Sequence, residues 1–240
     1  MCTEHLNTIK AATRGTIKLS QDMNKEDTLK SVNPGVFHEV ITKNGYALEK
    51  GCFRDSGVVD VGAHIGTFTY MAHTLGEAQF VLGIEPNKKS FFVLRDLFLD
   101  TANVQVRHAA MSYDTQPVSI SDEDNVSSIG TGTVVDAITL RQVVHMCSWW
   151  KSKRAILKMD IEGFEYDVLW SASRETIQFF NSIYLETHVD ANHNMAMNLY
   201  LQRLGFNLKR QYQMFKWDVL PDGTQTNWQP LNAWVSKFDR

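Results

Sequence analysis

The stretch VVDVGAHIGTFTY, residues 58–70, places an aspartate and two glycines between an apolar run and an amphipathic one. The run VVDV is typical of the end of a buried strand, and TFTYMAHTL has the pattern of a helix that stops at Gly76. Gly62 and Gly66 leave space for backbone amides to approach a ligand at the start of that helix. The stretch therefore predicts a ligand-binding turn, with Asp60 at the strand end beneath the ligand.

Strand and helix patterns continue to alternate beyond this turn. FVLGIE predicts a second strand, and Asn87 is expected to cap the helix KKSFFVLRDLFLD. VQVRHAAM, AILKMD and SIYLETH predict three further strands, and the tail alternates like an antiparallel hairpin. This order predicts an α/β fold with a mostly parallel sheet and helices on both faces, which binds ligands at the carboxyl ends of its strands. The polar residues 1–50 are expected to be an irregular cap or lid, and residues 51–240 the main domain.

Composition narrows the class of protein. The 24 Lys and Arg residues against 27 Asp and Glu residues give a net charge of −3, so no overall field recruits nucleic acid or an anionic membrane. No apolar run approaches the roughly 18 residues of a membrane span. The 3 cysteines lie far apart, which is typical of a reducing compartment. We therefore expect a cytoplasmic protein without a membrane span.

The acid after the second strand indicates the kind of ligand. Glu85 follows the turn by roughly 20 residues, where an acid can bind both hydroxyls of a ribose. The spacing in GAHIG is shorter than the G-x-G-x-x-G of dinucleotide sites. A glycine turn and a ribose-binding acid without a phosphate site favour a nucleoside that carries a positive centre. S-adenosyl-L-methionine is such a ligand and is the expected cofactor.

Four motifs in this order carry a family resemblance. DVGAHIG, GIEPN, VRHAAMS and KMDIEGFEYDVL resemble the FkbM-type S-adenosylmethionine-dependent methyltransferases over roughly residues 37–206. The resemblance implies a Rossmann-like class I methyltransferase fold with about seven strands, the last inserted antiparallel. It also implies methyl transfer, usually to a hydroxyl of a natural product, sugar or related small molecule. Carried over by position, the cofactor loop comprises Asp60, Gly62, Ala63 and Gly66, and Glu85 binds the ribose.

The chain departs from the family pattern at Arg141, where the family more often has Asp, and at two points that concern the cofactor. His64, also assigned to the cofactor loop, stands where the family often has Asn, which affects contacts to the methionine end. The third strand ends without the acid that many methyltransferases offer to adenine. Met111 and Ser112 are therefore expected to contact the adenine, together with backbone groups.

Acidic residues and a histidine follow the fourth and fifth strands. If these strands are neighbours, Asp160 and His188 meet at one edge of the sheet beside the cofactor methyl group. A neutral histidine with a pKa of about 6.5 is suited to accept the proton of the acceptor hydroxyl. We expect Glu186 to orient its ring, and Asp160 and Glu162 to hold the acceptor or the cofactor amine. The predicted catalytic residues are thus His188, Asp160 and Glu162, with Asp160 also contacting the cofactor.

Other functions stay open at this point. His188 and His193 in ETHVDANH are possible metal ligands by type, but their spacing matches no known site. A divalent ion at Asp160, Glu186 and Asp190 is the other alternative, and no metal is expected. An RNA ribose 2'-O-methyltransferase would use lysines near the fourth strand; Lys158 and Lys153 are present, but the set is incomplete. A degenerate fold kept as a binding module is disfavoured by the intact glycine turn. The expected partner is a small-molecule or glycan hydroxyl acceptor, and nucleic acid is not expected.

Overall fold

The computed structural model describes residues 24–121, 132–148, 150, 152–219 and 225–240, with the backbone alone described for 212–219 and 225–233. The helices are α2 (Lys25–Val32), α3 (Pro34–Phe37), the π-helical turn η1 (His38–Thr42), α4 (Thr67–Thr74), α5 (Lys88–Phe98), α6 (Leu140–Cys147), α7 (Glu165–Ser171), α8 (Arg174–Gln178) and α9 (Ala191–Arg203). The strands are β1 (Ser56–Val61), β2 (Phe80–Glu85), β3 (Val104–His108), β4 (Ala110–Ser112), β5 (Val118–Ile120), β6 (Thr133–Val135), β7 (Ala137–Thr139), β8 (Arg154–Met159), β9 (Ser182–Thr187), β10 (Asn207–Val219) and β11 (Gln225–Asp239). Among the described residues, no helix combines the length and the apolar character that crossing a bilayer requires.

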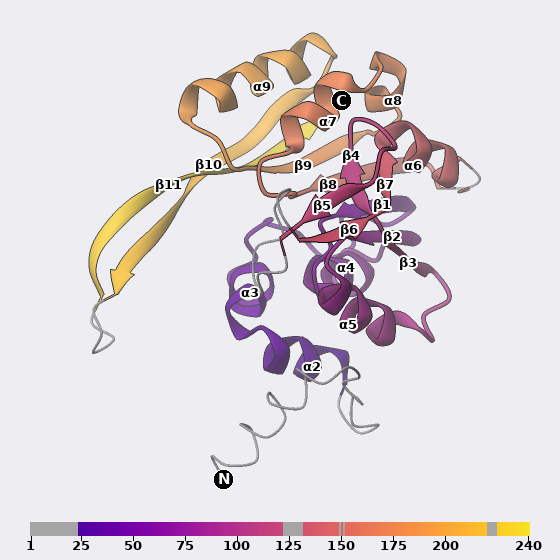
Figure 1. Cartoon of the computed structure of the whole chain (residues 1–240), viewed down its shortest axis with the longest axis vertical. Coiled ribbons are helices and arrows are strands. Elements are labelled where there is room, and N and C mark those ends of the chain that lie inside the picture. The colour runs from indigo at the N-terminus through magenta and orange to yellow at the C-terminus, as the bar shows by residue number, and fades with distance from the viewer. Residues whose placement is uncertain (1–23, 122–131, 149, 151, 220–224) are drawn as a thin grey trace.

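One seven-stranded sheet organises the chain (Figure 1), with the strand order β10-β11-β9-β8-β1-β2-β3. The pairs β1–β2, β1–β8, β2–β3 and β8–β9 are parallel. Strand β11 lies between β9 and β10 and is antiparallel to both. The predicted Rossmann-like sheet with an inserted antiparallel strand is confirmed, and so is the expectation that the fourth and fifth predicted strands, β8 and β9, are neighbours.

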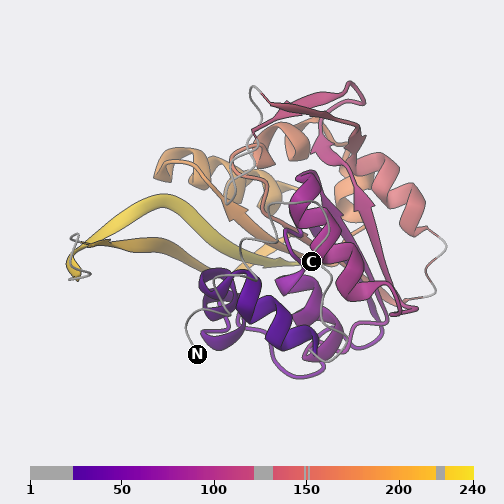
Figure 2. The ribbon, with the colours of Figure 1, turned by 60° about the horizontal axis from the view of Figure 1, so that its bottom comes forward.

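The sheet has an apolar core on each face. Neighbouring residues of a strand point to opposite faces, so Val58 joins one cluster and Val59 the other. Helices α4 and α5 pack in the first cluster with the N-terminal helices, whereas α6 to α9 pack in the second. Figure 2 shows the indigo and purple helices α2 to α5 together on one side of the sheet. The predicted helix cap is also confirmed, because the Asn87 side chain accepts hydrogen bonds from the first turn of α5.

The third predicted strand is wrong in its second half. Strand β3 pairs with β2, but β4 leaves the central sheet and pairs with β7 in a separate two-stranded sheet. The exchange occurs at Ala109, whose N–H still donates to the carbonyl of Glu85, while the next N–H, of Ala110, donates to Asp136. Both halves are apolar, and an apolar pattern does not record a change of pairing partner.

The expectation of an irregular N-terminal segment is also wrong within residues 24–50. Asn24 caps α2 and Asn33 caps α3 through side-chain oxygens. Leu29 and Phe37 are buried in the core beside α4. The apolar residues are too sparse to produce a helical period, so the polar composition concealed these helices. Residues 1–23 of the predicted cap lie outside the described residues.

Candidate functional site

A cavity of about 160 Å³ lies at the carboxyl ends of β1, β2 and β8. Six of the predicted cofactor residues line it, namely Gly62, Ala63, His64, Glu85, Met111 and Asp160. This edge is where the chain order of the strands reverses, with β2 on one side of β1 and β8 on the other. It is therefore the position at which open parallel sheets bind ligands.

Three predicted cofactor residues are buried beside the cavity instead of lining it. Asp60 is fully buried beneath the turn, where its Oδ2 accepts a hydrogen bond of 2.7 Å from Thr69 Oγ1. Gly66 packs against α5, and Ser112 is buried at the end of β4. Of the two residues predicted for adenine, only Met111 faces the cavity.

The glycines of the turn are required by contacts within the chain. A Cβ atom at Gly62 would lie 1.7 Å from the carbonyl oxygen of Asp160, and one at Gly66 would lie 2.7 Å from Leu94 Cδ1. Both glycines also have positive φ angles, +74° and +96°. The sequence suggested that backbone N–H groups of this turn point at a ligand. Those of Gly62 and Ala63 instead donate to the carbonyl of Ile84. The turn thus brings β1 into direct contact with the end of β8.

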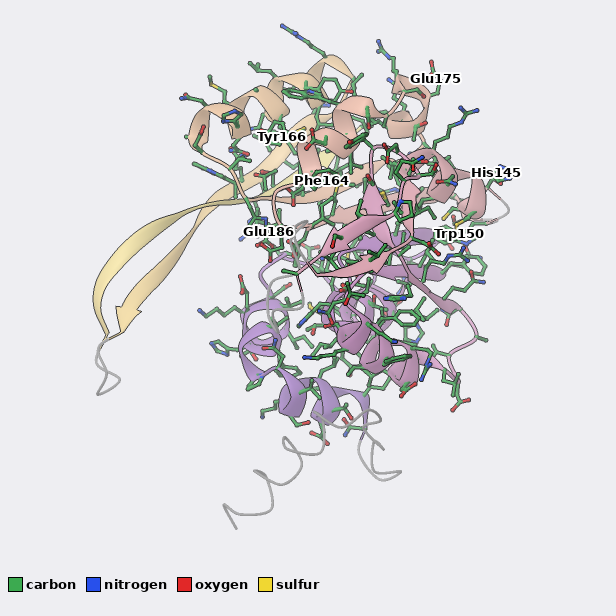
Figure 3. All side chains as sticks on the ribbon, viewed as in Figure 1. His145, Trp150, Phe164, Tyr166, Glu175 and Glu186 are labelled. Atoms are coloured by element: carbon green, nitrogen blue, oxygen red, sulfur yellow. The ribbon has the colours of Figure 1, made fainter. Side chains whose placement is uncertain are left out.

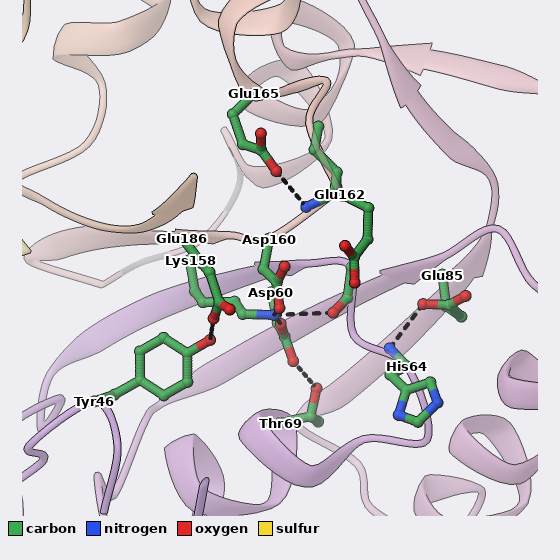
Figure 4. A network of polar contacts seen from close by, with 12 residues as sticks. Tyr46, Asp60, His64, Thr69, Glu85, Lys158, Asp160, Glu162, Glu165 and Glu186 are labelled. Atoms are coloured by element: carbon green, nitrogen blue, oxygen red, sulfur yellow. Dashed lines mark hydrogen bonds and ion pairs between the residues drawn. The ribbon is translucent and has the colours of Figure 1, made fainter. Parts of the chain in front are cut away.

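Glu85 is held in place by backbone donors. Its Oε2 accepts from His64 N and its Oε1 from Asn87 N, each at 2.7 Å, and the residue is 4% exposed. Burial raises the pKa of Glu85 to about 7, although the two N–H donors and Lys158 act in the opposite direction. Each carboxylate oxygen can still accept a second hydrogen bond. Glu85 therefore presents a fixed pair of acceptors to the cavity (Figure 4).

His64 adopts a backbone conformation that few residue types tolerate. Its φ angle is +51°, in the left-handed region where Asn, Asp and His are enriched. This explains why His can stand where the family often has Asn. Burial, aided by Lys158, lowers the pKa of the His64 ring.

Lys158 connects the two strand ends beneath the cavity (Figure 4). Its Nζ donates to the carbonyl of Gly62 at 2.9 Å and lies 3.3 Å from Asp60 Oδ1 and 3.6 Å from Asp160 Oδ2. Burial alone would lower the pKa of Lys158, but the charges of Asp60 and Asp160 outweigh burial and raise it. Sequence reasoning considered this residue only for an RNA methyltransferase. Its position inside an apolar strand was the signal for a buried ion pair.

The turn after β8 presents two predicted catalytic residues. Asp160 and Glu162 both line the cavity. The fully buried Glu165 accepts hydrogen bonds from the N–H groups of Ile161 and Gly163 and so fixes the turn. Glu162 has a φ angle of +57°, and Gly163 has +101°. Glu165 lies in the DIEGxE motif, yet nothing in the sequence pattern indicates that it organises the backbone.

The third predicted catalytic residue, His188, lies behind this turn and does not line the cavity. Its Nε2 is 3.4 Å from Glu162 Oε2 and 3.6 Å from Glu186 Oε1, and its Nδ1 is 3.6 Å from Glu165 Oε1. Burial lowers the pKa of His188, but Glu165, Asp160 and Glu162 outweigh burial and raise it to about 9. At neutral pH the ring is an imidazolium, whereas the sequence-based prediction assumed a neutral base.

Tyr46 and Glu186 form a pair that sequence reasoning missed. Tyr46 lines the cavity, and its hydroxyl donates to Glu186 Oε2 at 3.1 Å, although the two residues are 140 positions apart. Glu186 ends β9 near the N-terminal helices (Figure 3), and burial together with the charge of Asp160 raises its pKa well above the ordinary value. Burial, reinforced by Glu186, raises the pKa of Tyr46, so the phenol stays neutral.

Three side chains lie close enough together to bind one metal ion. One oxygen or nitrogen atom each from Asp160, Glu165 and His188 lies within 4.8 Å of the others, as judged over the described residues. Glu165, however, is already bonded to two backbone N–H groups. Asp190, considered with Glu186 from the sequence, instead caps α9. We therefore assign no metal ligands.

Comparisons with known proteins agree with this architecture. Residues 60–208 match the model of the methyltransferase FkbM domain. A Pyrococcus horikoshii structure, provisionally classed as an RNA methyltransferase, is 14% identical over 98% of both chains with a TM-score of 0.50, which supports the fold. A methyltransferase FkbM from Methylobacillus flagellatus is 18% identical over 97% of this chain and 60% of its own, with a TM-score of 0.45. No curated protein matches the sequence. Because the matched domain covers more than half of the chain, the protein belongs to the FkbM methyltransferase family.

Proposed function

We propose that this protein binds S-adenosyl-L-methionine and transfers its methyl group to a hydroxyl oxygen of a small molecule, natural product or sugar. The observation that carries the proposal is Glu85, a buried carboxylate with free acceptor positions, which faces the cavity beside the glycine turn. Two adjacent oxygens at the end of β2 suit the two hydroxyls of a ribose.

The remaining groups of the cavity fit the amino-acid end of the cofactor. Thr67 lies in the first turn of α4 and lines the cavity, and its buried hydroxyl has no hydrogen-bond partner among the described residues. A carboxylate placed there would gain this donor and the positive end of the helix dipole. Asp160, on the opposite wall, can accept from the ammonium group. Met111 supplies an apolar contact for the adenine.

Positioning and charge are the contributions this site makes to methyl transfer. When bound, the cofactor supplies a methyl group made electrophilic by its sulfonium. The acceptor oxygen must approach this carbon in line with the carbon–sulfur bond, so the enzyme gains rate by orienting it. Asp160 and Glu162 hold the acceptor or the cofactor amine in this proposal. In this proposal His188, behind Glu162, is charged at neutral pH and balances the neighbouring carboxylates, and only its neutral form, above about pH 9, can accept the released proton.

The charges of the site disfavour an RNA acceptor. Asp160 and Glu162 would repel phosphate groups, and the charge of Lys158 is buried between Asp60 and Asp160. Lys153 precedes β8, at the opposite end of the strand, and pairs with Asp55. Among the residues that the structure describes, the lysine set of an RNA ribose methyltransferase is therefore not assembled around this cavity.

Residues 1–50 complete the proposal as a cap on the domain formed by residues 51–240. Within the described part, Val36, Val40 and Tyr46 line the cavity. Excluding water at this wall would strengthen the electrostatic interactions inside. A cytoplasmic location belongs to the same proposal, since Cys52 and Cys147 are free thiols, as is typical of a reducing compartment.

Titration calorimetry with S-adenosylhomocysteine tests cofactor binding. Loss of hydrogen bonds to a charged acceptor costs about 1.5–3 kcal/mol, so Glu85→Ala should weaken binding by about one to two decades. Glu175→Ala, a change of an exposed acid on α8, is the matched control and should leave the affinity unchanged. Equal affinities of the parent and Glu85→Ala would remove Glu85 from the site, and no binding to the parent would refute the proposal.

Methyl transfer needs its own assay. A library of polyhydroxylated acceptors with methyl-labelled cofactor should yield labelled ether products. Cofactor binding without transfer to any member would favour a binding module, whereas label in RNA would favour ribose methylation.

A further inference from the structure

We propose that Tyr46 and Glu186 form the subsite that holds the oxygen receiving the methyl group. The proposal rests on the proposed function, because it assigns the acceptor end of the same cavity. It gives the N-terminal segment a direct part in the chemistry, through a residue that no sequence motif marks.

The order of the strands places this pair relative to the cofactor. Glu85 ends β2, Asp160 follows β8 and Glu186 lies at the end of β9, and the order across the sheet is β2-β1-β8-β9. Strands are spaced by about 4.8 Å, so Glu85 and Glu186 are separated by roughly 14 Å across the sheet. One methylene joins the ribose to the sulfur, so a ribose at β2 places the sulfonium over β1 and β8. The acceptor then lies over β8 and β9, where Tyr46 and Glu186 meet.

The Tyr46 hydroxyl is fixed in this position. The ring packs edge-on against Phe68 at 4.8 Å and against Tyr184 at 6.5 Å between centroids. The hydroxyl donates its proton to Glu186, which leaves its oxygen lone pairs to accept from a group in the cavity. Val36 and Val40 line the same wall and offer apolar contact to the carbon skeleton of an acceptor.

The pair also gives the acceptor proton a route away from the reacting oxygen. As the acceptor oxygen forms its bond to the methyl carbon, the carbon–sulfur bond breaks and its electron pair stays on sulfur. The acceptor proton moves to the Tyr46 oxygen while the Tyr46 proton moves to Glu186 Oε2, a step that requires Glu186 to be ionised before transfer. The products are a methyl ether, a neutral thioether, neutral Tyr46 and protonated Glu186. His188 Nε2 is 3.6 Å from Glu186 Oε1, so His188 is the next group in contact with this carboxyl.

Sinefungin tests the subsite without knowledge of the acceptor. In this analogue a protonated amine replaces the sulfonium methyl group, so its ammonium occupies the position next to the acceptor oxygen. In the full-length parent, this ammonium should hydrogen-bond to the Tyr46 oxygen, which Glu186 orients, and sinefungin should bind about ten- to a hundredfold more tightly than S-adenosylhomocysteine. Tyr46→Phe and Glu186→Gln should each remove most of that preference and leave the affinity for S-adenosylhomocysteine within about twofold. The double variant should lose no more than either single variant, because the two groups act as a unit.

Tyr184→Phe is the matched control. Tyr184 belongs to the same aromatic cluster but does not line the cavity, so its variant should keep the preference for sinefungin. Circular dichroism and thermal unfolding verify that Tyr46→Phe, which keeps the ring, is folded; Glu186→Gln carries the test if it is not. An unchanged preference in both variants, no preference in the parent, or a parallel loss of affinity for both compounds would overturn the subsite. A parent that binds neither compound would instead refute the proposed function.

Discussion

Among the residues of the site, carboxylates outnumber the cations that could balance them. Glu85, Asp160 and Glu162 line the cavity and Glu186 contacts Tyr46 of its wall, while the buried Lys158 is paired with Asp60 and Asp160. Crowded, buried carboxylates hold protons more tightly than free ones. A ligand that donates hydrogen bonds or carries positive charge should therefore bind with release of protons.

Glu85 makes cofactor binding depend on pH. Because the pKa of Glu85 is raised to about 7, the free protein keeps this carboxyl protonated below that pH. Ribose hydroxyls donate to the ionised form, so the complex has the lower pKa, and binding below pH 7 must expel a proton. The affinity for S-adenosylhomocysteine should rise with pH, by up to about tenfold per unit, and level off above about 7.

Calorimetry between pH 5.5 and 8.5 measures this dependence. Glu85→Gln, which keeps the shape but does not titrate, should bind more weakly, and the rise assigned to this carboxyl should disappear. A rise in the variant as steep as in the parent would assign the dependence to another group.

His188 should stabilise the fold in one pH range only. Its pKa is raised from 6.5 to about 9, so the folded protein holds this proton more tightly than the unfolded chain does. The resulting stability is fully present below pH 6.5 and is lost as pH rises through 9. His188→Ala should lower the free energy of unfolding by about 1–3 kcal/mol at pH 6, an amount that allows for solvent screening of a side chain one-quarter exposed.

Urea unfolding at pH 6 and pH 9.5 checks this. The difference between parent and variant should shrink at the higher pH. An equal difference in unfolding free energy at the two pH values would mean that the His188 ring contributes by packing and not by its charge.

Site residues at the ends of apolar strands could be predicted from the sequence. Site residues that depend on contacts between distant segments could not. Glu85 and Asp160 each end a recognisable strand, and the alternating order of elements brings such ends together. Tyr46 contacts Glu186 across 140 positions, and no local pattern encodes that contact. Likewise, the need for glycine at position 62 arises from the carbonyl of Asp160, which only the folded chain brings near.

At the scale of elements, the N-terminal helices belong to the core as well as to the cavity wall. Leu29 of α2 is fully buried in the cluster that includes α4 and α5. Leu29→Ala should lower the free energy of unfolding by about 2–5 kcal/mol, because it leaves a cavity in this core. Val32→Ala, in the same helix but 38% exposed, is the matched control and should change it by less than about 1 kcal/mol.

Chemical denaturation monitored by tryptophan fluorescence gives both values. Equal, small effects of the two variants would show that α2 is a detachable lid. A large effect of Leu29→Ala alone would show that the segment folds with the domain.

Whether a segment is a helix or a strand was easier to predict than which other elements it pairs with or packs against. The alternation of apolar strands and amphipathic helices identified the central strands, because periodicity reports which face of an element is buried. It did not reveal that β4 leaves the central sheet at Ala109, nor that polar residues 25–37 form helices. Both depend on contacts with distant segments and on capping by Asn24 and Asn33.

For the whole molecule, one sheet separates two apolar cores and exposes its carboxyl edge at a single reversal of strand order. Alternating strands and helices allow few other topologies, since crossovers between parallel strands are right-handed. The cavity therefore follows from the fold, whereas its chemistry follows from a few side chains at the strand ends.

The order β2-β1-β8-β9 has a consequence for how such enzymes diversify. In the proposed arrangement, each step across the sheet moves along the reactants, from the nucleoside over β2 to the acceptor over β9. Substitutions near β9 and in the N-terminal segment can then alter which alcohol is accepted while the nucleoside end stays intact, and changes near β2 do the reverse. During evolution, acceptor specificity can then change while binding of the methyl donor is kept. A library of variants mutated only on the β9 side should likewise change acceptor specificity and keep donor binding.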